Sequence, residues 1–396
     1  MRWIALLTAA LTGLWAGILT PVQVLLPQQV EALDAASKVT NLGLVHAVGA
    51  AVAIVANPLF GALSDRTRGR FGRRHPWTVV GVVVGALSLG FLSGQTTLAG
   101  VIVGWILVEA SLNAVLAALT ASLPDRVPVS QRGVVSAWSG IAQPLGPLVG
   151  LVLASFVLVS TSLGYLGLAV VLVVFTLPFV LFTPDAVLTS RPPFSWSSFF
   201  AGFWVSPRRY PDFAWAWGTR FLVQLANAFI LLYLYYFLQD AVGYADPSQG
   251  VFVLTGCYVV TLILSAMVTG VLSDRSGGRR KIFVLWSGVV MTVAAMLIAL
   301  WPSWPVAIAS ALILGLGYGA YQAVDLALIT QVLPAAENRA KDLGVINIAN
   351  AAPQVLAPAI AAPVITYLGG YTTLYLLTGL VALLGCIFVY RIKSVP

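Results

Sequence analysis

The sequence predicts an all-α integral membrane protein whose twelve transmembrane helices form two pseudo-symmetric six-helix bundles. Three observations lead to this fold class. The 396 residues are 59% hydrophobic and only 9% charged, whereas soluble domains carry about 25% charged residues. At about 20 residues per span plus short connections, the chain holds about twelve helices and no sizeable soluble domain. Loops in the first half of the chain also recur in the second half at a nearly constant offset.

The spans are the apolar runs between charged or Pro- and Gly-rich breaks. They fall near residues 3–26, 40–64, 77–95, 98–122, 133–157, 162–183, 213–239, 250–272, 282–301, 304–332, 343–367 and 371–390. The longest polar interruption separates the first six from the last six. We therefore expect an N-terminal bundle over 1–183, a cytoplasmic linker over 184–212 and a C-terminal bundle over 213–396.

The basic residues give the expected orientation, because cytoplasmic loops are enriched in Lys and Arg. With a cytoplasmic N-terminus, Lys38 is the one of 21 Lys and Arg residues on the other side and Arg220 lies within a span, which leaves 19 on the cytoplasmic side. We expect a multi-pass protein of the cell membrane with both termini in the cytoplasm. The apolar N-terminus resembles a signal peptide, but its apolar run continues past Pro21, which favours a span.

Composition argues against several other classes of protein. The net charge of +8 could indicate a nucleic-acid partner, but the basic residues lie in short loops between apolar runs, as membrane topology explains. Cys257 and Cys386 both lie in apolar runs, and His46 and His75 are the two histidines. We therefore expect no disulfide framework, no metal site and no cofactor.

The two halves share sequence at corresponding loops, as the internal repeats of transporters do. Residues 61–66 read Gly-Ala-Leu-Ser-Asp-Arg and residues 270–275 read Gly-Val-Leu-Ser-Asp-Arg, with five of six positions identical at an offset of 209. Further matches pair 120–124 with 330–334 at an offset of 210, and Gly133, Gln143 and Pro147 with Gly344, Gln354 and Pro358 at an offset of 211. These matches predict two homologous six-helix halves.

The repeated loops are candidate conformational switches. Gly lets two helices approach closely, and a carboxylate at a helix end can hold a neighbouring helix N-terminus or an Arg in one conformation and release it in another. The alternative is a static loop that only sets topology. The candidate switch residues are Gly61, Asp65, Arg66, Arg73, Arg74, Gly270, Asp274 and Arg275.

At these loops the chain resembles the major facilitator superfamily over essentially its full length. The loop from Asp65 to Pro76 is an extended form of that family's Gly-x-Leu-x-Asp-Arg-x-Gly-Arg-Arg pattern. Together with the stretches 317–325 and 340–345, it is similar to the branch of sucrose transporters and glycoside–pentoside–hexuronide symporters. The melibiose-type symporters place Asp in their first two helices, where this chain has no carboxylate, so their sodium site does not carry over. The resemblance implies a central cavity lined by helices one, four, seven and ten.

Three charged residues lie well inside the expected spans, where a charge normally faces a cavity or a partner. They are Glu109, Arg220 and Asp325, on the fourth, seventh and tenth spans. At about 1.5 Å per residue, Arg220 and Asp325 both lie roughly 12–14 Å from the cytoplasmic surface. We predict an ion pair between them; the alternative is that Arg220 extends to the interface while Asp325 caps a helix discontinuity.

Glu109 is the main candidate for proton coupling, because a carboxyl group shielded from water favours its neutral, protonated form. Asn113 lies one turn further along the same face. The alternative is a permanently neutral structural acid. Asp325 and His46 are further candidates for proton coupling, although His46 lies early in the second span.

Inward-facing amides and tyrosines are the candidate substrate contacts. Amide side chains both donate and accept hydrogen bonds, and aromatic rings stack on sugar faces. The candidates are Gln23, Asn113, Gln143, Arg220, Gln224, Asn227, Tyr321, Asp325, Asn347, Asn350 and Gln354. For any one of the amides, helix–helix packing is an equally good explanation.

These observations predict a secondary active transporter that works by alternating access and moves a small polar solute, a sugar or related polyol, with protons. A proton-driven exporter of drugs or other metabolites is the second interpretation. An intramembrane enzyme is disfavoured, because the interior acids lie on different helices with no His at similar depth. A primary pump is disfavoured too, because the sequence contains no Gly-rich phosphate-binding loop. We expect a functional monomer in the lipid bilayer.

Overall fold

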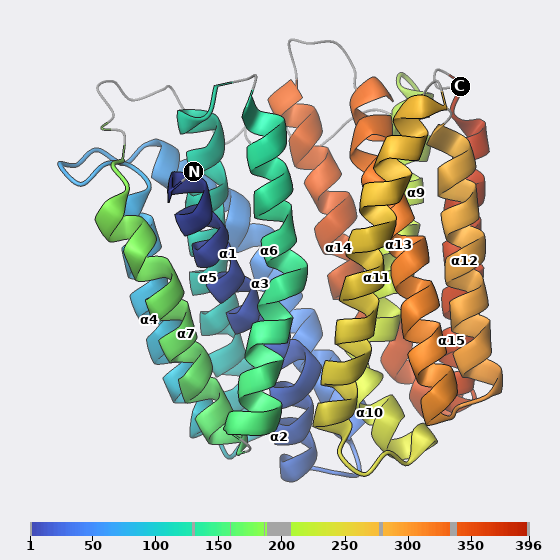
Figure 1. Ribbon diagram of the computed structural model, residues 1–396. Helices are drawn as coiled ribbons and strands as arrows, with labels where there is room; N and C mark the ends of the chain where they lie inside the picture. Colours follow the sequence, from blue (N-terminus) through green and yellow to red (C-terminus); the bar gives the residue numbers. More distant parts are fainter. Residues whose placement is uncertain are drawn as a thin grey trace. The chain divides into compact units, whose positions relative to one another are not determined.

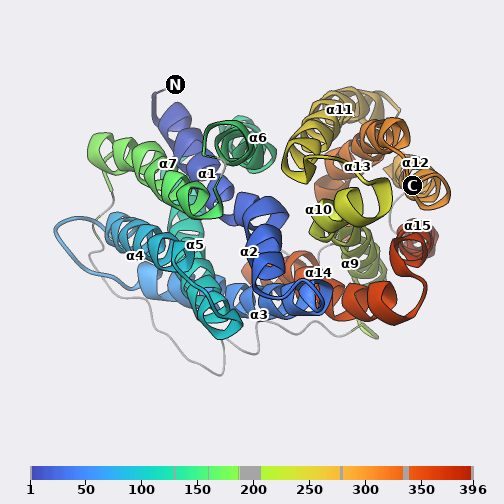
Figure 2. The same ribbon diagram turned by 90° about the horizontal axis from the view of Figure 1, so that it is seen from below.

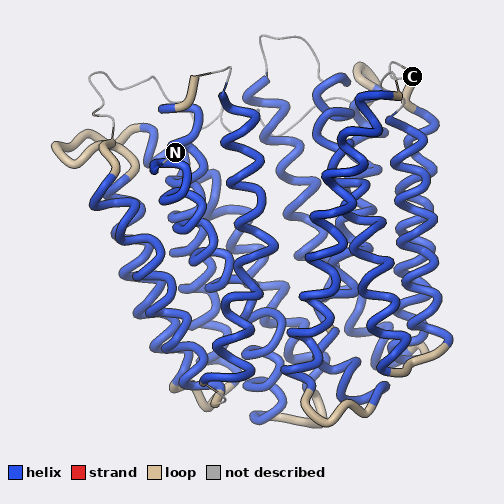
Figure 3. The backbone as a smooth tube through the Cα atoms, in the orientation of Figure 1, coloured by secondary structure: helices blue, strands red, loops and turns tan. Residues whose placement is uncertain are grey.

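The computed structural model describes residues 2–128, 131–158, 160–185, 187, 207–276, 280–332 and 339–393, and every regular element within these ranges is helical (Figure 3). Among the described residues, eleven helices are long and apolar enough to cross a membrane, and the number is twelve if one bent pair forms a single span. The predicted all-helical membrane fold is confirmed. The chain divides into two compact units, residues 1–193 and 194–396.

The helices of the first unit run side by side (Figures 1 and 2). They are α1 (Arg2–Thr20), the π-helical segment η1 (Pro21–Leu25), α2 (Leu26–Leu33), α3 (Lys38–Asp65), α4 (His75–Ser93), α5 (Leu98–Arg126), α6 (Arg132–Val152), the π-helical segment η3 (Leu153–Val157) and α7 (Thr161–Phe182). Helix α1 packs on α6 and α7, and α5 packs on α3 and α4. A methyl group added at Gly146 of α6 would meet the backbone of α1 at Trp15 and Ala16, so this glycine serves close helix contact within the chain.

The second unit is built in the same way. Its elements are α9 (Pro211–Leu232), α10 (Leu234–Phe237), the π-helical segment η4 (Leu238–Val242), α11 (Pro247–Arg275), α12 (Arg280–Leu300), α13 (Trp304–Val332), α14 (Arg339–Tyr367), α15 (Gly370–Ile387) and the 3-10 turn η6 (Phe388–Arg391). Helix α13 packs on α11, α12 and α9. Gly319 of α13 lies against the backbone carbonyl of Leu262 in α11, which leaves no room for a side chain there.

Two sequence expectations about the spans are wrong. The first span does not end near residue 26 but continues through η1 and α2 to Leu33. The polar Gln29 side chain is satisfied within this extension, because it donates to the carbonyls of Leu92 and Gln95 at 2.9 and 3.1 Å. The seventh span, expected as one helix over 213–239, is broken at Tyr233 with a bend of 51°. The break contains neither Pro nor Gly, the residues that usually signal a sharp kink. The other spans begin and end within a few residues of the expected positions.

Candidate functional site

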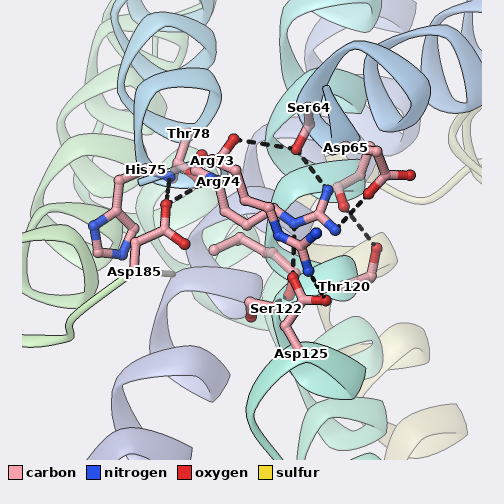
Figure 4. A network of polar contacts seen from close by, with 12 residues as sticks. Ser64, Asp65, Arg73, Arg74, His75, Thr78, Thr120, Ser122, Asp125 and Asp185 are labelled. Carbon is pink, nitrogen blue, oxygen red and sulfur yellow. Dashed lines mark hydrogen bonds and ion pairs between the residues drawn. The ribbon is translucent and has the colours of Figure 1, made fainter. Parts of the chain in front are cut away.

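A network of arginines and carboxylates occupies the loop between α3 and α4, where the first switch loop was expected (Figure 4). The buried Arg74 donates to Asp125 from Nε at 2.9 Å, to Asp65 from Nη2 at 2.6 Å and to Ser64 from Nη1 at 2.7 Å. Arg73 also pairs with Asp125. Burial alone would lower the pKa of the Arg74 guanidinium, but the carboxylates of Asp125 and Asp65 outweigh it and raise that pKa, so the group stays charged.

A third carboxylate fastens the other side of this loop. Asp185, two residues after Thr183, accepts hydrogen bonds from the backbone nitrogens of Arg74 at 2.6 Å and His75 at 2.8 Å. The first backbone nitrogens of a helix have no partner within that helix, and a negative charge is favourable at this end of α4. The Thr183 hydroxyl lies 3.3 Å from Nε2 of the His75 ring. Gly72, with φ +86°, passes against the Asp185 carboxylate, where any side chain would collide with it. The end of α7 is therefore tied to the start of α4.

Glu109 and Asn113 form the polar centre of α5. Both are buried, and the Asn113 amide donates to Oε2 of Glu109 at 3.0 Å and to the Glu109 carbonyl at 2.9 Å. Asn57 of α3 donates to the Asn113 oxygen at 3.5 Å. The acid therefore ends a ladder of amides that crosses from α5 to α3.

The other candidates of the first unit do not join this ladder by any hydrogen bond among the described residues. His46 is buried on α3, and its Nε2 atom has no hydrogen-bond partner there. Gln23 is buried within η1, and its Oε1 atom is likewise unpartnered. Gln143 is exposed on α6.

The second unit contains the predicted ion pair. Nη1 of Arg220, on α9, lies 2.9 Å from Oδ2 of Asp325, on α13, and the two side chains are 13% and 5% exposed. The Tyr321 hydroxyl, one helical turn before Asp325, donates to its other oxygen at 2.6 Å. The alternative, in which Arg220 extends away from Asp325, is therefore wrong.

Amides and tyrosines surround this pair. Arg220 donates from Nε to Oδ1 of Asn350, on α14, at 2.7 Å, and Gln224 donates to the same oxygen at 3.4 Å. The Tyr318 hydroxyl donates to the Gln224 oxygen at 2.5 Å. These contacts join α9, α13 and α14, so five of the substrate candidates meet at one point: Arg220, Gln224, Tyr321, Asp325 and Asn350.

Asn227 lies about one helical turn after Gln224 on the same face of α9, and it accepts a hydrogen bond from the Tyr258 hydroxyl of α11 at 3.2 Å. The rings of Tyr258, Tyr318 and Tyr321 form a row, with successive centroids 6.2 Å apart and tilted by 30° and 32°. All three polar residues of the predicted stripe, Arg220, Gln224 and Asn227, thus lie on the single helix α9, at positions i, i+4 and i+7.

Several predicted residues stand apart from these clusters. Gln354 is exposed on α14, and Gly61 and Gly270 have no neighbouring atom where a side chain would project. Arg275 is exposed at the end of α11, and Arg66 lies just beyond α3. The side chains of Asn347 and Asp274 lie outside the described residues.

Two carboxylates of the network around Arg73 and Arg74 could not be predicted from the sequence. Asp125 holds both arginines of the basic pair, yet its counterpart at an offset of 210 is Ala335, so the repeat gives no sign of it. Asp185 is separated from Arg74 by 111 positions. No local pattern indicates that a carboxylate after α7 caps α4.

Comparisons with known proteins agree with this geometry. The sequence profile of the Major Facilitator Superfamily matches residues 4–254 and, in a second match, residues 216–396. YfiU, an uncharacterised MFS-type transporter of Bacillus subtilis (strain 168), is 32% identical over 143 residues, which are 36% of this chain and 27% of that protein. The match thus spans about a quarter of the length of this curated relative.

The fold is also that of a solved transporter. The crystal structure of a mutant of the nucleoside transporter NupG matches with a TM-score of 0.76 at 14% identity and covers 99% of both chains. At this identity the likeness is one of fold. Because the family profile matches nearly the whole sequence, the chain belongs to the major facilitator superfamily of membrane transporters.

Proposed function

We propose that this secondary transporter moves a sugar or related polyol together with protons, with its two halves giving alternate access to a site near the middle of the membrane. The family is one of transporters, not of enzymes. We also propose that the chain falls in the branch of sucrose transporters and glycoside–pentoside–hexuronide symporters. The extended loop from Asp65 to Pro76 supports that placement.

The polar network around Arg220 and Asp325 is the observation that carries the proposal. A buried ion pair inside a span is costly and needs partners. Here Asn350 accepts from Arg220 and Tyr321 donates to Asp325. Gln224 in turn donates to Asn350. Amides and phenols are the groups that bind sugar hydroxyls. The adjoining tyrosine row offers flat rings on which a sugar face stacks.

Glu109 is the proposed site of proton coupling. A carboxyl group shielded from water is uncharged when protonated and is strongly disfavoured when ionised without a partner. Glu109 is 7% exposed and receives one amide hydrogen bond, from Asn113, so its charge depends on taking up and releasing a proton. Asp325 and His46 are the secondary candidates for this role.

Uptake into proteoliposomes tests both parts of the proposal. We expect radiolabelled sugar to accumulate when the interior is alkaline and to equilibrate only slowly without a pH gradient. Glu109→Gln keeps an oxygen for the Asn113 amide but has no titratable proton, so we expect it to abolish accumulation while leaving exchange of solute across the membrane. The matched control is Gln131→Glu, which changes an exposed residue of the same unit. Accumulation by Glu109→Gln that still follows the pH gradient would rule out Glu109.

Export of a lipophilic cation is the second candidate function, and the row of three tyrosines is the feature that favours it, since aromatic faces bind cations. The same vesicles separate the two functions. Loss of a fluorescent cationic drug from vesicles driven by a pH gradient, with no sugar uptake, would favour export.

A further inference from the structure

We propose that the transported solute bears a carboxylate, which binds Arg220 in place of Asp325. This inference deepens the proposed transport function and rests on it. It adds a requirement for charge to the polar site around Arg220.

The hydrogen-bond directions around Arg220 follow from one fact: a guanidinium can only donate. Because Nε of Arg220 lies 2.7 Å from Asn350, the atom it meets there is the amide oxygen. Gln224 contacts the same oxygen at 3.4 Å, so it must present its NH2 group. The Gln224 oxygen is then turned to the Tyr318 hydroxyl, which donates to it. One donor-only side chain therefore orients three neighbours.

In this order each amide oxygen of the cluster accepts a hydrogen bond, while several donors are left over. The oxygens of Asn350, Gln224 and Asn227 each accept at least one hydrogen bond from within the unit. Within the part of the chain that the structure describes, the amide nitrogens of Asn350 and Asn227 and the Nη2 atom of Arg220 donate none to protein. A donor-rich site selects a ligand that is rich in acceptors.

The ion pair itself leaves Arg220 available. Its contact with Asp325 joins one nitrogen and one oxygen, and Nη1 is not aligned to make a hydrogen bond. A guanidinium binds a carboxylate best through two parallel hydrogen bonds. Arg220 is 13% exposed against 5% for Asp325, so the cation is the more accessible partner. An entering carboxylate gains the two-point contact that Asp325 does not make.

Displacement of Asp325 has a consequence for charge. Without Arg220, the Asp325 carboxylate would keep, among the described residues, only the Tyr321 hydroxyl, and a buried charge with no counter-charge is strongly disfavoured. Uptake of one proton on Asp325 restores neutrality, so one proton enters with each carboxylate. The titratable groups around Asp325 are Arg220 from α9, Tyr318 and Tyr321 from its own helix, Tyr258 from α11 and, beyond Tyr321, Cys386 from α15. The described part of α12 contributes none of these neighbours.

Thermal unfolding of the purified full-length protein tests the inference with two matched pairs of solutes. Gluconate and sorbitol differ at one carbon, as carboxylate and alcohol, and lactate and propane-1,2-diol do the same on a smaller frame. We expect gluconate to raise the unfolding temperature more than sorbitol does, and lactate more than propane-1,2-diol. We expect Arg220→Gln to weaken the apparent affinity for gluconate about tenfold or more, whereas the control Arg208→Gln, at an exposed turn, leaves it unchanged.

Each outcome bears on the inference. A shift by sorbitol equal to that by gluconate overturns it and leaves the polyol proposal standing. A shift by lactate alone supports the proposed carboxylate on the solute and overturns the proposed polyol substrate. If none of the four solutes shifts the unfolding temperature, both proposals are overturned. If Arg220→Gln does not fold, Asp325→Asn serves in its place. It keeps the shape of Asp325 without a titratable group, so we expect it to bind gluconate with no proton taken up, whereas wild type takes up about one. Equal proton uptake by both overturns the exchange.

Discussion

At the scale of the residue, Arg220 and Asp325 depend on each other, because either charge alone would lie inside a span without its counter-charge. Removing one member of a buried pair costs about 3–5 kcal/mol in measured cases. We expect Arg220→Ala and Asp325→Ala each to lower the unfolding temperature and to abolish transport. The exchange Arg220→Asp with Asp325→Arg keeps opposite charges in contact, so it should recover part of the lost stability.

Differential scanning fluorimetry of the four proteins in detergent measures this prediction. Arg209→Ala, which removes a positive charge from an exposed position, serves as the control and should have the same unfolding temperature as the wild type. A double exchange that is no more stable than the single variants would show that the two charges do not depend on each other.

The sequence predicted this pair but not its surroundings, for a physical reason. Helical rise is regular, so counting from Asp212 and from Pro334 gives the depths of Arg220 and Asp325 directly. The contact with Asn350 depends instead on how α14 is rotated against α9, which is set by packing between distant segments. The orientation of the Gln224 amide follows in turn from that contact. Depth could therefore be predicted, whereas rotation could not.

At the scale of the element, the start of α4 depends on Asp185, a residue that follows α7. The carboxylate accepts from two backbone nitrogens there, and loss of such a cap costs about 1 kcal/mol. We expect Asp185→Ala to lower the unfolding temperature and to slow transport, because Arg74 begins the same turn and holds Asp65 and Asp125. Asp185→Asn, which keeps an acceptor but no charge, should lie between Ala and wild type.

Asp34 provides the matched control for this prediction. It also accepts from two backbone nitrogens, those of Ala36 and Ser37, both at 3.1 Å, but in an exposed turn. Water replaces such bonds at little cost, so Asp34→Ala should change the unfolding temperature less than Asp185→Ala. Initial uptake rates at saturating solute give the transport readout. Equal effects at the two positions would mean that the cap on α4 has no special role.

Element boundaries were predictable where composition changes and unpredictable where packing decides. The apolar runs gave ten of the twelve spans within a few residues, since a switch from apolar to charged residues marks the membrane surface. The bend at Tyr233 lies in an unbroken apolar run, Ile230 to Phe237, and all of these side chains except Leu231 are buried. Hydropathy is the same on both sides of such a bend, so a hydropathy pattern does not predict where the helix breaks.

At the scale of the whole molecule, the duplicated halves share a scaffold but not their polar interiors. At an offset of 210 the counterpart of Glu109 is Gly319, which packs against the backbone of α11, and the counterpart of Asp325 is Val115. Each half therefore has apolar packing at the position where the other has its acid. The predicted duplication accounts for the recurring loops. Divergence at interior positions accounts for an amide ladder with an acid in one half and an ion pair in the other.

The orientation of both halves is the prediction that concerns the whole chain. Basic loops favour the cytoplasm, so the exposed Arg70 and Arg209 should lie inside and the exposed Ala36 and Ser303 outside. Single cysteines at these four positions, with Cys257 and Cys386 replaced by alanine, can be labelled in cells with a membrane-impermeant maleimide. We expect labelling of Ala36→Cys and Ser303→Cys in intact cells, and of Arg70→Cys and Arg209→Cys only after permeabilisation.

The same experiment determines whether the bent pair Pro211–Leu232 and Leu234–Val242 crosses the membrane. If it does, eight spans separate positions 36 and 303, and an even number returns the chain to the same side. If the pair instead turns back within the membrane, seven spans remain and Ser303→Cys would be labelled only after permeabilisation while Ala36→Cys is labelled in intact cells. That result would leave eleven spans and place the loop between α12 and α13 opposite to the side that its lack of basic residues favours. Because the basic loops of both halves favour the same side, we expect the bent pair to be one broken span.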